Sequence, residues 1–585
     1  MTCRSKHVRC DEKQPNCTRC SRLSLICSWS TPPTSASQVQ HGPQELRNLP
    51  LEVSTMSLSP AMESPLYCST RIGDFPERCG LDEWWPGWDM DDGLLPCNFM
   101  ASPNSSISDI YPQGLASCLN IENFERIFAS SGSDNLQSMR NMPGLLLHPS
   151  ASLSDHHVTL PNSLTLTAPE HKALRHYQTT YSLYRTTKDP NWSTHKVLLS
   201  LGSYNPMIMH FLLAVSINDY SLRKGQNSSQ EAENHFQAGA GLLIEMMKLG
   251  MEDDHVTTMA AYFFIYLYMS KRKSTAPHRL SQLSLTVLDY VERHELNTRC
   301  VAFFDSSTTL VTNSTKTNNS LLARLIMWTF DEDVKCSFQS TGGHLARHLT
   351  KHSARTKDVY DASRNALATH WGAEYPNSQQ LDDDVNSTVL EFLWALMPLW
   401  QDINDLSHEH DPNSLESRSR IEQTFLYLEQ KYSSVFRLSA DAGTKPRPRV
   451  LVNADFDVVL FSALQIYYFR SILSDLSMET PPDIQSALKT LLTIIQRTFA
   501  SRGTELHDRL QWPLFLAGIE TDDAIYKDWI FSRLTSERVA TALQRTVDAQ
   551  ALSGKRFRMA EIRQMLYDTE DLSLPGSSTG FLNTI

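Results

Sequence analysis

The chain has 585 residues, of which 41% are hydrophobic and 20% are charged, so it can bury a large core and is not disordered as a whole. Its net charge of -12 excludes a protein that coats nucleic acid along its full length, so any contact with DNA must come from a local basic segment. No signal peptide is recognisable, and the longest apolar run, residues 259–269, is shorter than the roughly 20 residues that span a bilayer. We expect an intracellular protein without a membrane span.

The first 30 residues form a basic, cysteine-rich segment. It holds six lysines and arginines against two acids, and its five cysteines follow the spacing Cys3-x6-Cys10-x6-Cys17-x2-Cys20-x6-Cys27. In a reducing compartment, clustered thiols bind metal more often than they form disulfides. Two cysteines separated by two residues can reach the same zinc ion. The spacing therefore predicts a small zinc-binding module that carries charge suited to DNA.

This array, with Pro15 ahead of Cys17, resembles the fungal six-cysteine binuclear zinc cluster, in which six thiolates hold two zinc ions. The resemblance implies that Cys20 is a bridging ligand and that the terminal ligands are Cys3, Cys10, Cys17 and Cys27. It places Lys6 and His7 where the family reads the base edges of a CGG triplet in the major groove of double-stranded DNA. The remaining basic residues are expected to contact phosphates, namely Arg4, Arg9, Arg19 and Arg22.

The sequence departs from the family pattern at one place, because the first family cysteine would fall immediately before Met1. Two explanations are open. In the first, which we favour, the chain as given begins at an internal methionine of an N-terminally longer protein, and the complete cluster binds two zinc ions. In the second, the cluster is degenerate, and the protein is a regulator that lacks autonomous DNA binding and acts through protein contacts. A third reading, of another class, is an enzyme or small-molecule binding protein with a vestigial N-terminus.

Residues 31–165 are rich in Ser, Pro, Asn and Gly, which predicts a disordered linker, since such a segment buries too little apolar surface to offset its ordering entropy. Within it, residues 81–95 interleave Trp84, Trp85 and Trp88 with five acids. This acidic-aromatic segment resembles a transcriptional activation segment that contacts the transcription machinery. The alternative is a patch that folds back onto the main domain.

From about residue 166 to 570 the apolar residues recur at helical spacing, which predicts a large all-α domain followed by a polar tail at 571–585. Leu174, Tyr177 and Tyr181 illustrate the spacing, and Asn205-Pro206 predicts a capped helix start. Residues 307–319 and 407–416 are polar and predict loops between helices. The expected fold class is mainly α, with a small zinc module, a linker and a large helical regulatory domain.

Residues 512–520 and the following Asp528-Trp529 resemble the fungal-specific transcription factor domain that lies behind zinc clusters. The local pattern predicts that Pro513 begins a helix and that Gly518 permits close helix contact. Leu514, Phe515 and Ile519 should pack inward. The resemblance implies a regulatory and dimerising body.

The motifs that could indicate an enzyme or a metal site are better explained in other ways. Residues 576–580 match the Gly-x-Ser-x-Gly string, but too few residues follow for the helix that this motif requires. Histidines at i, i+4 and i+8 would share one helix face, and we interpret them as part of a solvated basic helix rather than a metal site: His344, His348 and His352. Lys271-Arg272-Lys273 fits either a nuclear import signal or the charged end of a helix.

Together these features predict a nuclear, zinc-dependent, sequence-specific regulator of RNA polymerase II transcription that is not an enzyme. Its expected partners are double-stranded DNA and, through the acidic-aromatic segment, the transcription machinery. A homodimer and a monomer are both compatible with the sequence.

Overall fold

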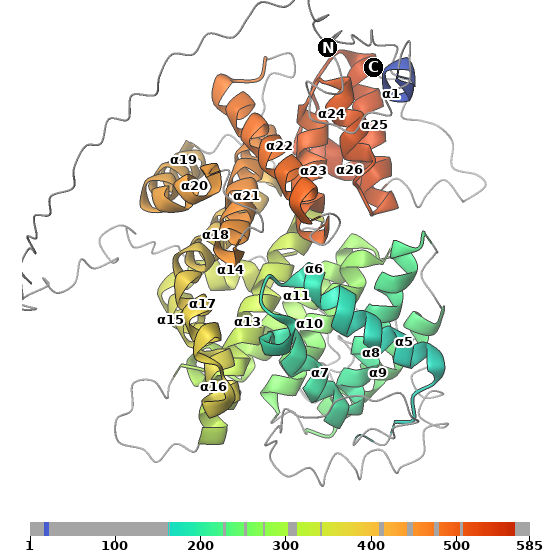
Figure 1. Ribbon diagram of the computed structural model, residues 1–585, viewed down its shortest axis with the longest axis vertical. Coiled ribbons are helices and arrows are strands. Elements are labelled where there is room, and N and C mark those ends of the chain that lie inside the picture. The colour runs from blue at the N-terminus through green and yellow to red at the C-terminus, as the bar shows by residue number, and fades with distance from the viewer. Residues whose placement is uncertain are drawn as a thin grey trace, which may run out of the picture. The chain divides into compact units, whose positions relative to one another are not determined.

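A computed structural model describes residues 17–22, 162 and 164–567. Short stretches inside the last range are not described, namely 226–229, 251–253, 273–274, 302–312, 340–341, 409–414, 442–447, 473–478 and 503–506. By its contacts the chain divides into two units, one of which, residues 28–103, lies outside the described residues. Every regular element within the described residues is a helix, which confirms the all-α prediction (Figure 1).

The short helix α1 spans Thr18–Arg22. The helical domain begins with α5 (Ala168–His176), the π-helical turn η3 (Tyr177–Tyr181), α6 (Ser182–Arg185), η4 (Pro190–Trp192), α7 (Thr194–Tyr204), α8 (Pro206–Arg223), α9 (Gln230–Lys248), α10 (His255–Lys271), α11 (Pro277–Arg293), α12 (Leu296–Arg299) and α13 (Asn313–Gln339). It continues with α14 (His344–Lys351), α15 (Ser353–Arg364), α16 (Ala366–Trp371), η5 (Gly372–Glu374), α17 (Asn377–Val385), α18 (Ser387–His408), α19 (Leu415–Lys431), α20 (Ser433–Ala440), α21 (Arg449–Ile472), α22 (Pro482–Arg502), α23 (His507–Glu520), α24 (Ala524–Phe531), α25 (Glu537–Ser553) and α26 (Met559–Tyr567).

Side-chain caps explain where several helices begin. The Asn205 side chain accepts a hydrogen bond from the backbone N–H of Ile208 at 3.2 Å, and Pro206 occupies the first turn of α8, as the sequence predicts. At the start of α5, Glu170 accepts hydrogen bonds from the backbone N–H and the hydroxyl of Thr167. Such caps satisfy donors that would otherwise have no partner at a helix end.

The core of the domain is built on helices that are buried on all sides. In α10 every residue from Val256 to Met269 is buried, and α8 and α13 pack against it. Further along, α21 packs against α18, α22 and α23, which lie beside it in Figure 1. Among the described residues one helix, α21, is long and apolar enough to cross a membrane, but 78% of its apolar stretch is buried inside the domain, as in a core helix.

Both predicted loops coincide with breaks between helices, but their predicted bounds were too wide. The predicted loop at 307–319 is partly helical, since α13 begins at Asn313, and α18 continues to His408, inside the predicted loop at 407–416. The three histidines from His344 do not share one helix, because α14 ends at Lys351 and His352 starts a new helical segment. Burial of the apolar faces of these helices outweighs the polar composition of their ends.

Several histidines are held in the neutral form by burial. His195 is fully buried, where its Nδ1 lies 2.9 Å from the hydroxyl of Tyr177, and desolvation together with nearby arginines lowers its pKa to about 3. Burial likewise lowers the pKa of three others to about 4, namely His210, His370 and His408. In the unfolded chain these groups would take up protons near pH 6.5.

We therefore expect the free energy of unfolding to fall as the pH is lowered from about 6.5 towards 4, because the unfolded chain binds protons that the native state excludes. The variant His195→Gln should show a slope that is shallower by about one proton. Urea unfolding at several pH values measures this, with the exposed His278→Gln as control. Equal slopes for His195→Gln and the wild type would contradict the assignment.

Candidate metal centre and its regulatory domain

Two of the five predicted zinc ligands, Cys17 and Cys20, lie at the start of α1. The backbone N–H of Cys20 donates to Cys17 Sγ at 3.4 Å, and the carbonyl of Cys17 accepts from the backbone N–H of Ser21 at 2.9 Å. Both thiol side chains are buried. The thiolate can accept such a hydrogen bond, and it is the form of cysteine that binds zinc. The chemistry and placement of this pair therefore fit two ligands of one metal.

The structure describes only some of the other predicted site residues. Arg22 lies in the last turn of α1 with an exposed side chain, and the backbone of Arg19 lies in the same helix. The rest lie outside the described residues, namely Cys3, Arg4, Lys6, His7, Arg9, Cys10 and Cys27. Within the described part of the chain, no group of three or more His, Cys, Asp or Glu side chains is placed to hold a metal ion.

The segment 512–520 forms the second half of α23. Pro513 lies inside this helix, which begins at His507, so the prediction that Pro513 starts a helix was wrong. Leu514, Phe515 and Ile519 are buried, as predicted. A proline inside a helix leaves one carbonyl of the preceding turn without its intrahelical donor. The burial of these and other large apolar side chains on this helix offsets that cost.

Gly518 brings α23 close to α25. A Cβ atom at this position would lie 2.7 Å from Cδ2 of Leu543 and 3.4 Å from Cγ2 of Ile530. The absence of a side chain therefore allows the close helix contact that the sequence predicts.

A buried ion pair ends the same segment. Arg470 Nε donates to Glu520 Oε2 at 2.6 Å, and the two side chains are only 1% and 0% exposed. The guanidinium also donates to the carbonyl of Ile519 at 2.9 Å, to Gln550 Oε1 at 2.9 Å and to the carbonyl of Phe557 at 3.1 Å. Arg470 thus connects α21 to α23, to α25 and to the segment that follows α25. Each of these contacts is a hydrogen bond from the guanidinium to an oxygen atom.

Comparison with known families matches both parts of the chain. The fungal Zn(2)-Cys(6) binuclear cluster domain matches residues 1–37, and the fungal specific transcription factor domain matches residues 143–548, more than half of the chain. The chain belongs to the fungal specific transcription factor family. No curated protein and no solved structure matches it significantly.

The two matches make the protein a fungal zinc-cluster transcription factor. They confirm the resemblance drawn from the cysteine spacing and from residues 512–529, and neither family is an enzyme family. The match over residues 1–37 implies zinc binding and a role in binding DNA.

Inside this fungal transcription factor domain, Lys271 is part of an ionic network. Its ammonium donates to Asp219 Oδ1 at 3.0 Å and to Asp508 Oδ2 at 2.7 Å, which joins α10 to α8 and α23. Arg272 forms an ion pair with Glu233 at 2.7 Å. Two cations of the Lys271-Arg272-Lys273 motif are therefore engaged within the domain, which favours the helix-end interpretation over an import signal.

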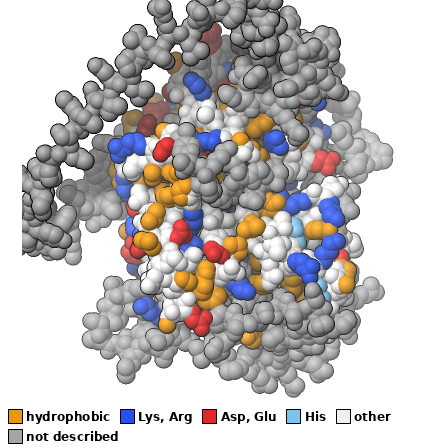
Figure 2. Space-filling model, viewed as in Figure 1, with side chains coloured by type: hydrophobic (Ala, Val, Ile, Leu, Met, Phe, Trp, Pro, Cys, Tyr) orange, Lys and Arg blue, Asp and Glu red, His pale blue; other side chains and the backbone are white. Residues whose placement is uncertain are grey.

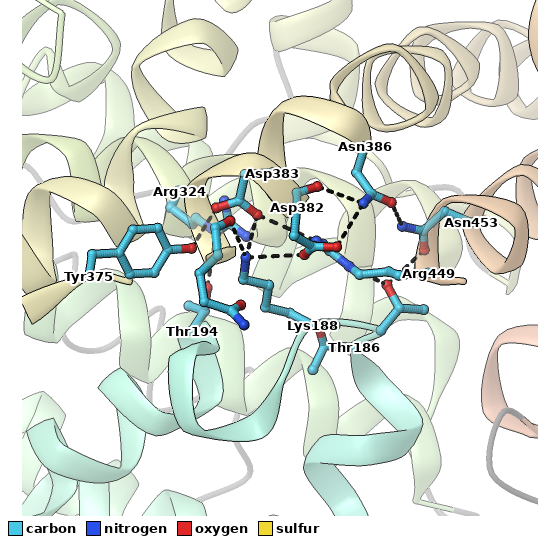
Figure 3. A network of polar contacts seen from close by, with 12 residues as sticks. Thr186, Lys188, Thr194, Arg324, Tyr375, Asp382, Asp383, Asn386, Arg449 and Asn453 are labelled. Carbon is cyan, nitrogen blue, oxygen red and sulfur yellow. Dashed lines mark hydrogen bonds and ion pairs between the residues drawn. The ribbon is translucent and has the colours of Figure 1, made fainter. Parts of the chain in front are cut away.

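A second polar network joins the segment after α6 to α17 and α21 (Figure 3). The buried ammonium of Lys188 donates to Asp383 Oδ1 at 2.6 Å and to Asp382 Oδ2 at 3.3 Å. Arg449, the first residue of α21, donates to the same two carboxylates. The hydroxyl of Tyr375 donates to Asp383 Oδ2 at 2.5 Å. Two cations thus neutralise two acids, and we interpret the cluster as a structural connection.

Sequence reasoning missed these ionic contacts. Asp455, Asp457 and Arg470 are buried charged residues in the otherwise largely apolar α21, and they are the signal in the sequence that charges must be buried there. The partner Glu520 follows 50 residues later, and no local spacing rule relates the two positions. Asp457 is buried, and desolvation raises its pKa well above the usual range.

We expect Arg470→Met to lower the free energy of unfolding by about 3–5 kcal/mol, because it leaves the buried charge of Glu520 with only the more distant Arg556, at 3.5 Å, as a cationic partner. The exposed arginine of α20 supplies a matched control, and Arg437→Met should cost about 0.5 kcal/mol or less. Replacing both members of the pair, in Arg470→Met/Glu520→Leu, should recover part of the loss. Equal costs for Arg470→Met and Arg437→Met in urea unfolding would disprove this role.

Proposed function

We propose that this protein is a zinc-dependent, sequence-specific regulator of genes transcribed by RNA polymerase II, and that it reads CGG triplets in the major groove. The observation that carries the proposal is the match of the zinc-cluster domain over the cysteine array, with Cys17 and Cys20 placed together at the start of α1. In the proposed assignment zinc is held by Cys3, Cys10, Cys17, Cys20 and Cys27. Bound zinc supplies the folding energy of so small a module.

In this proposal the DNA contacts divide into two kinds. Lys6 and His7 contact base edges, where a basic side chain donates to the N7 and O6 acceptors of guanine. His7 is only partly charged near neutral pH, so we expect its contribution to grow as the pH falls. The arginines contact phosphates and position the module, namely Arg4, Arg9, Arg19 and Arg22.

The helical domain is proposed as the regulatory body and the segment 81–95 as the contact with the transcription machinery. The mixture of acids and tryptophans in that segment suits an apolar groove on a partner protein. A protein with these roles acts in the nucleus.

The match of the fungal specific transcription factor domain over residues 143–548, which covers the helical domain and not the cysteine array, is compatible with a second candidate. In this alternative the protein regulates transcription without autonomous DNA binding, through protein contacts of the helical domain.

We predict that the full-length, zinc-loaded protein binds a duplex with a CGG triplet in preference to a scrambled one, and that Lys6→Ala removes most of this preference, about 1–3 kcal/mol. The control Lys13→Ala removes the same charge from the same segment, and it should weaken binding to both duplexes equally. Competition gel shifts measure both. An unchanged CGG preference in Lys6→Ala would refute the base contact, and no binding by the wild type would favour the second candidate.

A further inference from the structure

The end of α8 and the exposed side of α5 form a cationic patch around Tyr220. The ammonium groups of Lys172 and Lys224 lie 4.8 Å and 4.5 Å from the centroid of its ring. Both lysines are exposed, and so is Arg175, one turn further along α5. Among the residues that the structure describes, neither lysine forms an ion pair with a carboxylate. Figure 2 shows Lys and Arg side chains gathered in the region of α5.

The carboxylates of α5 and α8 are engaged with residues other than the two lysines of the patch. The only acid in α5 is Glu170, whose Oε1 lies 3.1 Å from His235 Nε2. The only acid in α8 is Asp219, which is 3% exposed and accepts from Arg223 Nε at 2.7 Å and from Lys271 Nζ at 3.0 Å. These contacts hold the pKa of Asp219 well below its usual range. The outward positive charge of the patch is therefore not cancelled by its own helices.

Tyr220 is fixed between the two lysines. The ring of His176 meets it edge to face at 5.3 Å, and His176 Nε2 lies 2.9 Å from Asp219 Oδ2, which anchors that imidazole. The neighbouring ammonium groups of Lys172 and Lys224 lower the pKa of the Tyr220 phenol, so its oxygen lies in a positive potential. Two ammonium groups and a hydroxyl are thus presented together on the surface, a set of donors suited to the oxygens of an anion.

We propose that the patch formed by Lys172, Tyr220 and Lys224 contacts the phosphate backbone of the DNA to which the zinc cluster of the same chain binds. Lysine and tyrosine hydroxyl groups are common donors to DNA phosphates, and such contacts carry no sequence information. Because the cluster and the patch belong to one chain, binding through the cluster raises the local concentration of phosphate at the patch, and a weak contact then adds to affinity. The inference rests on the proposed function, since it needs DNA bound by this chain.

The test measures the salt dependence of binding by the full-length, zinc-loaded protein to a long duplex with a CGG triplet. Each neutralised phosphate contributes about 0.9 to the slope of log K against log salt, so Lys172→Ala/Lys224→Ala should reduce the slope by about 1.8. The control Lys489→Ala/Lys555→Ala removes two exposed lysines elsewhere and should leave the slope unchanged. Tyr220→Phe removes the hydroxyl without a change of charge and should also preserve the slope.

The loss in Lys172→Ala/Lys224→Ala should be the same for CGG and scrambled duplexes, because phosphate contacts do not discriminate between sequences. The thermal unfolding of Lys172→Ala/Lys224→Ala should match that of the wild type, since both side chains are exposed. The variant Lys172→Gln/Lys224→Gln repeats the test with longer, uncharged side chains. A slope equal to that of the wild type would overturn the inference, and so would a loss confined to CGG sites. If the wild type binds no DNA, the proposed function fails as well, which separates that outcome from failure of the patch alone.

Discussion

The buried charge of Arg470 sets a constraint on which much of the helical domain depends. A guanidinium inside an apolar helix must find acceptors for its donors, because an unpaired buried charge costs several kcal/mol. In this chain the acceptors come from Glu520, Ile519, Gln550 and Phe557. The helices α23 and α25 and the segment after α25 must therefore all pack against α21. The ion pair therefore specifies the packing of the C-terminal helices more sharply than hydrophobic contact alone would.

The segment that marks the family has its physical explanation in the same place. Residues 512–520 carry five buried apolar side chains, from Leu514 to Ile519, together with the glycine that admits Leu543 and the carboxylate that pairs with Arg470. This part of the protein is a structural element, without chemistry of its own. The zinc-cluster end follows a different principle, since a module of about 30 residues has too little core to fold alone and takes its stability from metal ligation.

Periodicity was enough to predict the class of the fold and many of its details. It identified the inward side chains of α23, and the Asn205 cap predicted the start of α8. It failed at Pro513, because packing of the whole helix outweighs the local signal of a proline. It failed again at His352, where a regular spacing runs across a helix end.

The cysteine spacing predicted the kind of site, since ligand chemistry depends on short sequence separations. The ionic contacts of Lys271, Lys188 and Arg470 could not be predicted, because their partners are distant in the chain.

The proposed function depends on zinc held by the N-terminal cysteine array. The most direct measurement is the zinc content of the purified full-length protein, alone and as Cys17→Ala/Cys20→Ala, with Cys300→Ala/Cys336→Ala as a control for two cysteines of the helical domain. We expect bound zinc, up to two ions per chain, that is lost in Cys17→Ala/Cys20→Ala and retained in the control. A zinc-free wild type, or zinc that persists without Cys17 and Cys20, would contradict it.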